Sequence, residues 1–364
     1  MKRIFTIIAC ALYATMGFAQ GANSYKISLK GFDLYDGEKV YLYKPAGRTA
    51  IATDSAIVAN KELVFQGELT DQGGLRVVAK DLKKPQLATF LLEAGEILLQ
   101  KKGDFYTIAG TPGNVAYSQF MEETRPFTEK MREIVIAAND TTITKEQREE
   151  LIEKYYAVEE QKTEKAYTTM KANLDNLLGV FLFKTTATHL EIDQAAAVMD
   201  KIPAKYVDEE VEKIKAYIST AIKTQAGKEM TDFTLNSPEG TPVTLSEIVK
   251  KNKYTLVDFW ASWCGPCRAD MPHIVEVYKA YKEKGLEIVG VSLDNDEKAW
   301  KEALTTMNMT WPQMSDLKGW RSEGAGLYAV RSIPATVLID QNGIIVARDL
   351  RGKTLDDKLA ELLK

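Results

Sequence analysis

The chain has 364 residues, of which 45% are apolar and 27% are charged, and its formal net charge is −4. This length and composition are typical of a soluble globular protein with two or three domains. The slightly acidic balance, without a run of basic residues, argues against nucleic acid or anionic lipid as the main partner.

A signal peptide is predicted over residues 1–19. Two basic residues precede an apolar stretch from 4 to 18, and small residues occupy the two positions that a signal peptidase reads, so we expect cleavage before Gln20. The mature protein is then expected in the periplasm or cell envelope. Two alternatives stay open: an uncleaved membrane anchor, and a lipoprotein modified at Cys10.

Residues 20–113 are predicted to form a β-sandwich domain. Short strands are indicated at 25–29, 40–43, 63–65, 75–79, 97–99 and 105–108. Turn signals separate them at Asp36-Gly37, at 72–74 and at 102–104. We expect an antiparallel sandwich, a fold that commonly serves as a binding domain or as a spacer between domains. Nothing in its sequence indicates catalysis.

The period changes to helical over 114–226, where charged stretches alternate with apolar stripes. Thr144 to Gln147 matches a capping box that opens the longest helix. Gly179, Pro203 and Gly227 are expected to interrupt the helices, and Gly227 marks the start of the next domain. We therefore predict a helical segment between two domains.

Residues 227–364 alternate strand and helix, which is typical of an α/β domain with a mixed sheet and helices on both faces. Buried strands are indicated at 254–260, 286–293 and 336–339, and a fourth at 344–346 pairs through the turn Asn342-Gly343. A final helix is expected to open over 354–357, which matches a capping box.

The most informative motif is Cys264-Gly265-Pro266-Cys267, directly after the predicted strand 254–260. Two thiols one helical turn apart at a strand-to-helix junction are typical of a dithiol redox centre. The helix dipole and its unpaired N–H groups favour a thiolate at the exposed helix start, so Cys264 is the expected nucleophile and Cys267 the expected resolving thiol.

The cysteines allow two other interpretations, a structural disulfide and a zinc site. Loss of the signal peptide removes Cys10, so any disulfide joins Cys264 to Cys267, and as a structural staple so short a loop constrains little. A zinc site would need His189 and His273, which lie far apart in helical segments without a second cysteine pair. We predict no metal and no cofactor besides the redox-active disulfide.

These residues resemble the thioredoxin superfamily. The run 257–267 matches its active-site segment, 268–272 resembles the TlpA-like envelope branch, and 332–336 is similar to its cis-proline loop. The resemblance covers about 229–364, including an insertion over 294–331 that is also similar to the envelope branch. The N-terminal part resembles a small domain of undefined role that is often fused to such modules.

The resemblance implies roles for further residues. Asp258 matches the buried acid of thioredoxin, and Asp270, one helical turn after Cys267, is a second candidate for removing the proton from the resolving thiol. A shallow substrate groove is expected from Trp263, Gly265, Pro266, Ile333 and Pro334.

The function that follows is reduction of disulfides in envelope proteins, with a membrane thiol as electron donor. Three alternatives stay open: a disulfide isomerase or oxidase with the same site, a thiol peroxidase, and a binding protein in which the redox domain is auxiliary. The reduction potential separates the first from a reductase, and peroxidases of this kind use a single activated cysteine.

Overall fold

The computed structural model describes residues 23–46, 49–70, 73–83 and 86–364. They form two compact units: one holds the described residues before 187 together with 202–206, and the other holds 187–201 and 207–364. The predicted signal peptide, its cleavage point and Cys10 lie outside the described residues. The domain boundaries expected at 113 and 226 stay a prediction. Within the described ranges, no helix combines the length and apolar character that a membrane crossing requires.

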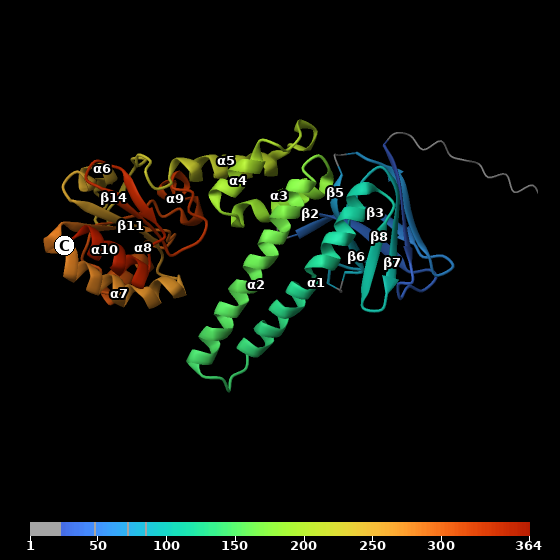
Figure 1. Cartoon of the computed structure of the whole chain (residues 1–364), viewed down its shortest axis with the longest axis horizontal. Coiled ribbons are helices and arrows are strands. Elements are labelled where there is room, and N and C mark those ends of the chain that lie inside the picture. The colour runs from blue at the N-terminus through green and yellow to red at the C-terminus, as the bar shows by residue number, and fades with distance from the viewer. Residues whose placement is uncertain (1–22, 47–48, 71–72, 84–85) are drawn as a thin grey trace, which may run out of the picture. The chain divides into compact units, whose positions relative to one another are not determined.

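The first unit begins with two sheets of four strands each among its described residues (Figure 1). The strands are β1 (Ser24–Lys30), β2 (Lys39–Ala46), β3 (Thr49–Ile57), β4 (Leu63–Glu68), β5 (Gly74–Ala79), β6 (Ala88–Leu92), β7 (Gly95–Lys102) and β8 (Phe105–Ala109). One sheet has the order β4-β1-β7-β8 and the other β3-β2-β5-β6. Alternate residues such as Ile27 and Leu29 of β1 are fully buried, as expected for strands with one core face.

The prediction of a purely antiparallel sandwich is wrong at one pair. β1 runs parallel to β7, with Tyr25 opposite Gly95, whereas the other paired strands of these sheets are antiparallel. The whole second sheet lies between β1 and β7 in the sequence, so no short turn fixes their relative direction. Only strands joined by a tight turn must run antiparallel.

Helices complete the first unit: α1 (Pro112–Ala138), α2 (Lys145–Ala172), α3 (Leu177–Thr186) and the short 3-10 helix η2 (Ala204–Tyr206). Helices α1 and α2 lie side by side as a long hairpin in Figure 1. The capping box is confirmed, because Thr144 accepts from the N–H of Gln147, and the Gln147 side chain accepts from the N–H of Thr144.

Gly179 does not interrupt a helix, so that expectation is wrong. It lies inside α3, where a Cβ atom would come within 2.1 Å of the backbone oxygen of Asn173. The missing side chain permits this close backbone approach. Pro203 does lie between helices, and Gly227 follows the last helix of the segment with a positive φ of 82°.

The second unit begins with η1 (Ala187–His189), α4 (Ile192–Met199) and α5 (Glu209–Lys223). Its strands are β9 (Thr234–Asn236), β10 (Pro242–Thr244), β11 (Tyr254–Trp260), β12 (Leu286–Ser292), β13 (Gln313–Met314), β14 (Ala335–Asp340) and β15 (Ile345–Arg348). Its remaining helices are α6 (Leu245–Val249), α7 (Gly265–Tyr281), η3 (Lys282–Lys284), α8 (Glu297–Thr306), η4 (Gly319–Arg321), α9 (Glu323–Leu327) and α10 (Lys353–Leu362).

The five-stranded sheet of this unit has the order β13-β12-β11-β14-β15 and is mixed, as predicted. Strand β11 is central, parallel to β12 and antiparallel to β14. The turn at Asn342-Gly343 joins β14 to β15, and Gly343 adopts the positive φ of 81° that favours glycine. The central strand β11 is buried along nearly its whole length. The residues that follow Trp260 therefore have a fixed position at the end of this strand.

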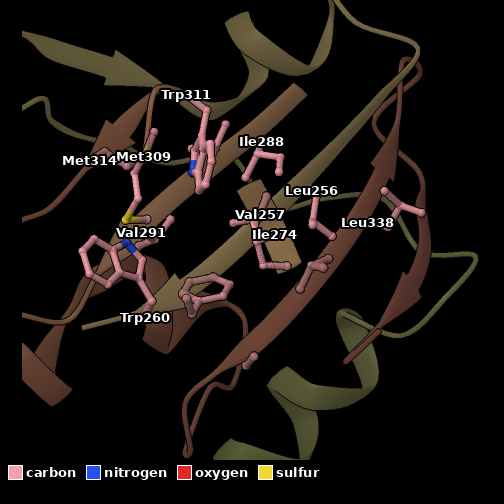
Figure 2. Close-up of a cluster of buried hydrophobic side chains, with 14 of the residues drawn as sticks. Leu256, Val257, Trp260, Ile274, Ile288, Val291, Met309, Trp311, Met314 and Leu338 are labelled. Atoms are coloured by element: carbon pink, nitrogen blue, oxygen red, sulfur yellow. The ribbon is translucent and has the colours of Figure 1, made fainter. Parts of the chain in front are cut away.

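One continuous apolar core fills the part of the second unit from Phe233 to Leu363. Figure 2 shows part of it, with labelled side chains from β11 (Leu256, Val257, Trp260), β12 (Ile288, Val291), α7 (Ile274), β14 (Leu338) and the segment around β13 (Met309, Trp311, Met314). Helix α7 packs against β12, and α6 packs against β11 and β12. The core therefore holds the start of α7 rigidly against the sheet.

The capping box expected at 354–357 is wrong. Helix α10 already begins at Lys353, and the Thr354 hydroxyl donates to the carbonyl oxygen of Arg351 instead of capping Asp357. Asp357 forms an ion pair with Lys353 one turn earlier in the same helix. The Thr-x-x-Asp pattern therefore lies inside α10 and does not mark the start of the helix.

Candidate active site

The two cysteines lie where β11 gives way to α7. Cys264 is the N-cap residue of α7 and forms a disulfide with Cys267, the third helical residue. The backbone N–H of Cys267 donates a hydrogen bond to Sγ of Cys264 over 3.1 Å. Gly265 and Pro266 occupy the exposed first two positions of the helix. This donor and the helix dipole both favour negative charge on Cys264 when the pair is reduced.

The expected exposure of Cys264 is wrong for the disulfide form, because Cys264 is 5% exposed and Cys267 is 2% exposed. The loop before β14 faces the sulfur: the carbonyl oxygen of Ile333 lies 3.7 Å from Sγ of Cys264. The peptide bond from Ile333 to Pro334 is cis, as the family resemblance implied. The loop at Ile333 and Pro334 therefore lies against the disulfide.

Asp258 lies in β11 and is 3% exposed. Burial, and to a smaller extent the charge of Asp270, raises the pKa of the Asp258 carboxyl to about 7, while the Arg351 guanidinium opposes the rise. A carboxyl that titrates near neutral pH can both take up and return a proton under ordinary conditions. The structure thus couples the two predicted acids electrostatically.

Asp270 is half-buried and has partners that the sequence did not indicate. Its Oδ2 lies 3.6 Å from Nε of Arg351, and its Oδ1 lies 4.0 Å from Nδ1 of His273. His273 Nε2 is in turn 2.9 Å from Oδ1 of Asp356. Asp270 therefore belongs to a charged cluster that joins α7 to the C-terminal segment.

A second buried acid, Asp294, holds the loop that carries the cysteines. Its carboxylate accepts from the backbone N–H of Ser262 at 2.9 Å and from the Ser262 hydroxyl at 2.6 Å. It also accepts from the Ser292 hydroxyl at 2.7 Å. The end of β12 thereby fixes the loop that enters α7. Sequence reasoning missed this role, although parallel neighbouring strands such as β11 and β12 end at the same sheet edge.

Trp263, which the sequence predicts as a groove residue, precedes Cys264 and is half-exposed. Its ring contacts Trp320 of η4, with ring centroids 6.1 Å apart and planes at 55°. Trp320 was also missed, because nothing in the sequence between 294 and 331 marks a residue that returns to the active site.

Among the described residues, neither histidine joins the cysteines in a group that could hold a metal ion. His189 lies in η1, and His273 is engaged with acids on α7 and α10. Across the part of the chain that the structure describes, no cluster of three or more His, Cys, Asp or Glu side chains could hold a metal ion.

We expect Asp270→Asn to lower the pKa of Asp258 and to slow release from the mixed disulfide roughly tenfold, because a like charge and a proton acceptor near Cys267 are both lost. Arg351→Gln should move the pKa of Asp258 the opposite way. Carboxyl NMR titration and stopped-flow release rates measure the two effects. Asp357→Asn is the control, and equal Asp258 midpoints in all variants would contradict the coupling.

A mixed sheet with a Cys-x-x-Cys disulfide at a strand-to-helix junction, opposite a cis-proline loop, defines a thioredoxin-like thiol-disulfide oxidoreductase. Residues 226–348 match the model of the AhpC/TSA family, and residues 25–117 match that of DUF4369, a domain of unknown function. The predicted combination of a thioredoxin-like domain with an N-terminal domain of unknown function is thereby confirmed.

The relatives agree with this class. The chain is 32% identical over 150 residues to thiol-disulfide oxidoreductase ResA of Bacillus cereus, covering 41% of this chain and 83% of that protein. The chain is also 32% identical over 150 residues to the thioredoxin-like protein YneN of Bacillus subtilis. That match covers 40% of this chain and 83% of YneN. The chain belongs to the family of ResA-like thiol-disulfide oxidoreductases, so it is a redox enzyme.

Solved structures include the C-terminal domain of a putative thiol-disulfide oxidoreductase from Bacteroides thetaiotaomicron. That domain is 35% identical in sequence to this chain. The match covers 39% of this chain and 97% of that domain, and the TM-score is 0.37. A thiol-disulfide oxidoreductase from Bacteroides fragilis is 36% identical, with 37% of this chain and 100% of that chain covered and a TM-score of 0.36.

Proposed function

We propose that this protein is a reductase of disulfides in proteins of the cell envelope. One observation carries the proposal: Cys264 caps α7 and its sulfur accepts the N–H of Cys267, an arrangement that favours an attacking thiolate. The dipeptide between the cysteines, Gly265-Pro266, is the one that reducing thioredoxins carry. A dipeptide tunes the potential without fixing the direction, so the direction needs a measurement.

In the proposed reaction the Cys264 thiolate attacks one sulfur of the partner disulfide. A new sulfur–sulfur bond joins Cys264 to the partner, and the partner's other sulfur leaves as a thiolate. Cys267 then loses its proton and attacks Sγ of Cys264, which releases the second partner thiolate and re-forms the internal disulfide. Two electrons pass to the partner, and its two thiolates take up two protons.

The proton of Cys267 is assigned to Asp258 and Asp270. Asp258 is the first acceptor because the pKa of its buried carboxyl is raised to about 7, within reach of a neutral-pH proton transfer. Asp270 contributes from the adjacent turn of α7. The proton then returns to the departing partner thiolate.

The partner is proposed to lie as an extended segment along the loop at Ile333 and Pro334, where the Ile333 carbonyl already approaches Cys264. Trp263, Gly265 and Pro266 supply the other side, since all three are exposed at the start of α7. Disulfide-containing proteins are the proposed substrates, and no nucleic acid is expected.

A reductase in an oxidising compartment must be re-reduced after each turnover. A membrane protein that presents a dithiol is the proposed donor: its thiolates attack the 264–267 disulfide and are themselves oxidised. Location in the periplasm or envelope rests on the predicted cleavage after residue 19 and is part of the same proposal.

The deciding experiment is the equilibrium of the Cys264–Cys267 pair against glutathione in the full mature chain. A potential of about −200 to −270 mV supports a reductase, whereas a value near −120 mV would identify an oxidant. Insulin reduction by residues 187–364 compared with the whole chain tests the binding-protein alternative. Catalytic consumption of hydrogen peroxide that persists in Cys267→Ser and is lost in Cys264→Ser would instead favour a peroxidase.

A further inference from the structure

Two tryptophans are left exposed at the disulfide while the other tryptophans of the chain are buried. Trp263 is 51% exposed and Trp320 is 52% exposed, whereas Trp260, Trp300 and Trp311 are at most 3% exposed. Among the large apolar side chains of 187–364, these two alone are exposed. Exposed aromatic surface concentrated in one place marks an interaction site more often than chance exposure does.

The two rings face one another as a unit. Their centroids lie 6.1 Å apart at an angle of 55°, within the range of favourable aromatic pairs. Trp263 precedes Cys264 in the chain, whereas Trp320 comes from η4, in the insertion between β12 and β14. We call them the tryptophan pair.

Both loops that carry the pair are attached to the last residue of β12, Ser292. The Ser292 hydroxyl donates to Asp294, whose carboxylate holds Ser262 beside Trp263. On the other side, the Ser315 hydroxyl donates to the Ser292 carbonyl oxygen over 2.9 Å. One strand end therefore sets the spacing of the two rings.

The loop that carries Trp320 is ordered by its own hydrogen bonds. The Asp316 carboxylate accepts from the backbone N–H groups of Lys318 and Glu323, on either side of η4. The Ser315 hydroxyl accepts from the N–H of Leu317. A loop fixed in this way presents Trp320 without an ordering penalty on binding, which is what a preformed subsite requires.

We propose that the tryptophan pair is a subsite for a large apolar or aromatic side chain two positions from the reacting cysteine of the partner, and that Trp320 is a specificity-determining residue. This inference rests on the proposed function, because it is the disulfide exchange that brings a partner segment to Cys264. It adds a preference among partners and leaves the chemistry of the thiols unchanged.

The geometry points to this occupant. A partner cysteine bonded to Cys264 lies beside Trp263, and in an extended segment side chains two residues apart project on the same side about 7 Å from each other. A side chain two positions from the partner cysteine therefore reaches the rings, whereas the adjacent side chain projects to the opposite side. Apolar and aromatic groups gain most from covering such surface, whereas small polar ones gain little.

The test uses the full mature chain and two disulfide-linked peptides that differ only in carrying Phe or Ser two positions from the cysteine. We expect the native protein to prefer the Phe peptide about tenfold in kcat/KM. Trp320→Ala should reduce this preference to within about twofold, and Trp320→Phe should restore most of it. Reduction of hydroxyethyl disulfide and the redox potential should stay unchanged, as should all readouts for Phe105→Ala, an exposed aromatic of the other unit.

The activities of the native protein and of Trp320→Ala distinguish a failure of the proposed function from a failure of the subsite. A native protein that reduces neither peptide nor hydroxyethyl disulfide refutes the proposed function itself. If the native protein is active but Trp320→Ala keeps the full preference for the Phe peptide, the subsite is overturned. Equal losses on both peptides and on hydroxyethyl disulfide also overturn it, because Trp320 would then act on the thiol pair.

Discussion

Cys267→Ser should accumulate mixed disulfides that are bonded through Cys264, whereas Cys264→Ser should form none and should lose disulfide reduction entirely. The N-cap sulfur of α7 accepts the N–H of residue 267 and lies at the positive end of the helix dipole, so it remains a thiolate and still attacks. Without the thiol of Cys267, nothing within the active site releases the partner.

Trapping is measured by expressing the variant with its native N-terminus, blocking free thiols with acid and alkylating agent, and separating adducts without reductant. Mass spectrometry then identifies the bonded cysteine. The double variant Cys264→Ser/Cys267→Ser is the control, and added reductant should abolish the adducts. Pro334→Thr in the Cys267→Ser background should increase trapping, because the loop at Ile333 faces the bonded sulfur.

Alkylation at graded pH assigns the roles independently of any partner. With the pair reduced, Cys264 should react at lower pH than Cys267, because helix position and not exposure separates two cysteines that are both buried in the disulfide form. Adducts through Cys267, or a lower pKa for its thiol, would reverse the assignment. An absence of adducts in an envelope that contains other disulfide proteins would favour the binding-protein alternative.

The sequence was sufficient where local pattern determines structure. The buried run 254–260 followed by a helical repeat placed Cys264 at a strand-to-helix junction, and β11 and α7 confirm that placement. The turn at Asn342-Gly343 was equally clear, because its conformation favours one residue type. Such features depend on residues a few positions apart.

The sequence was insufficient where contacts join distant segments. Ser262 and Asp294 are 32 positions apart, and Asp270 contacts Arg351, which lies even further along the chain in the loop before α10. Trp320 reaches Trp263 only because the insertion folds back over the end of β12. Sequence periodicity does not predict these long-range contacts, because they depend on which strand ends lie next to one another in the folded sheet.

Weak strands were also missed. β3 (Thr49–Ile57) has no fully buried residue and lies at the edge of its sheet, so it carries little of the apolar alternation that marks a strand. The parallel pairing of β1 with β7 was missed for a related reason: alternation reports which face is buried but not the direction of the neighbour.

Asp258→Asn should stabilise the redox unit at pH 8 by on the order of 4 kcal/mol while leaving its stability near pH 4 almost unchanged. The pKa of the buried Asp258 carboxyl is about 7 in the folded protein, against an ordinary value of 3.8. The folded state therefore holds the proton more tightly, and its stabilising effect is fully present below about pH 4 and is lost as the pH rises through 7. A gap of about three pKa units, at about 1.4 kcal/mol each, gives the expected size.

Asparagine has nearly the same shape and never ionises, so it removes the free energy of holding a charge in the core above pH 7. Urea unfolding of the oxidised full chain, followed by tryptophan fluorescence, measures the effect on the right unit, because all five tryptophans lie between 260 and 320. Asp357→Asn, an exposed acid on α10, is the control and should show no gain that grows with pH.

The same Asp258→Asn change should slow mixed-disulfide release near neutral pH, since the acceptor for the Cys267 proton is gone. A stability gain that is the same at pH 4 and pH 8 would show that folding does not raise the pKa of Asp258, and its part in the proton transfer would have to pass to Asp270.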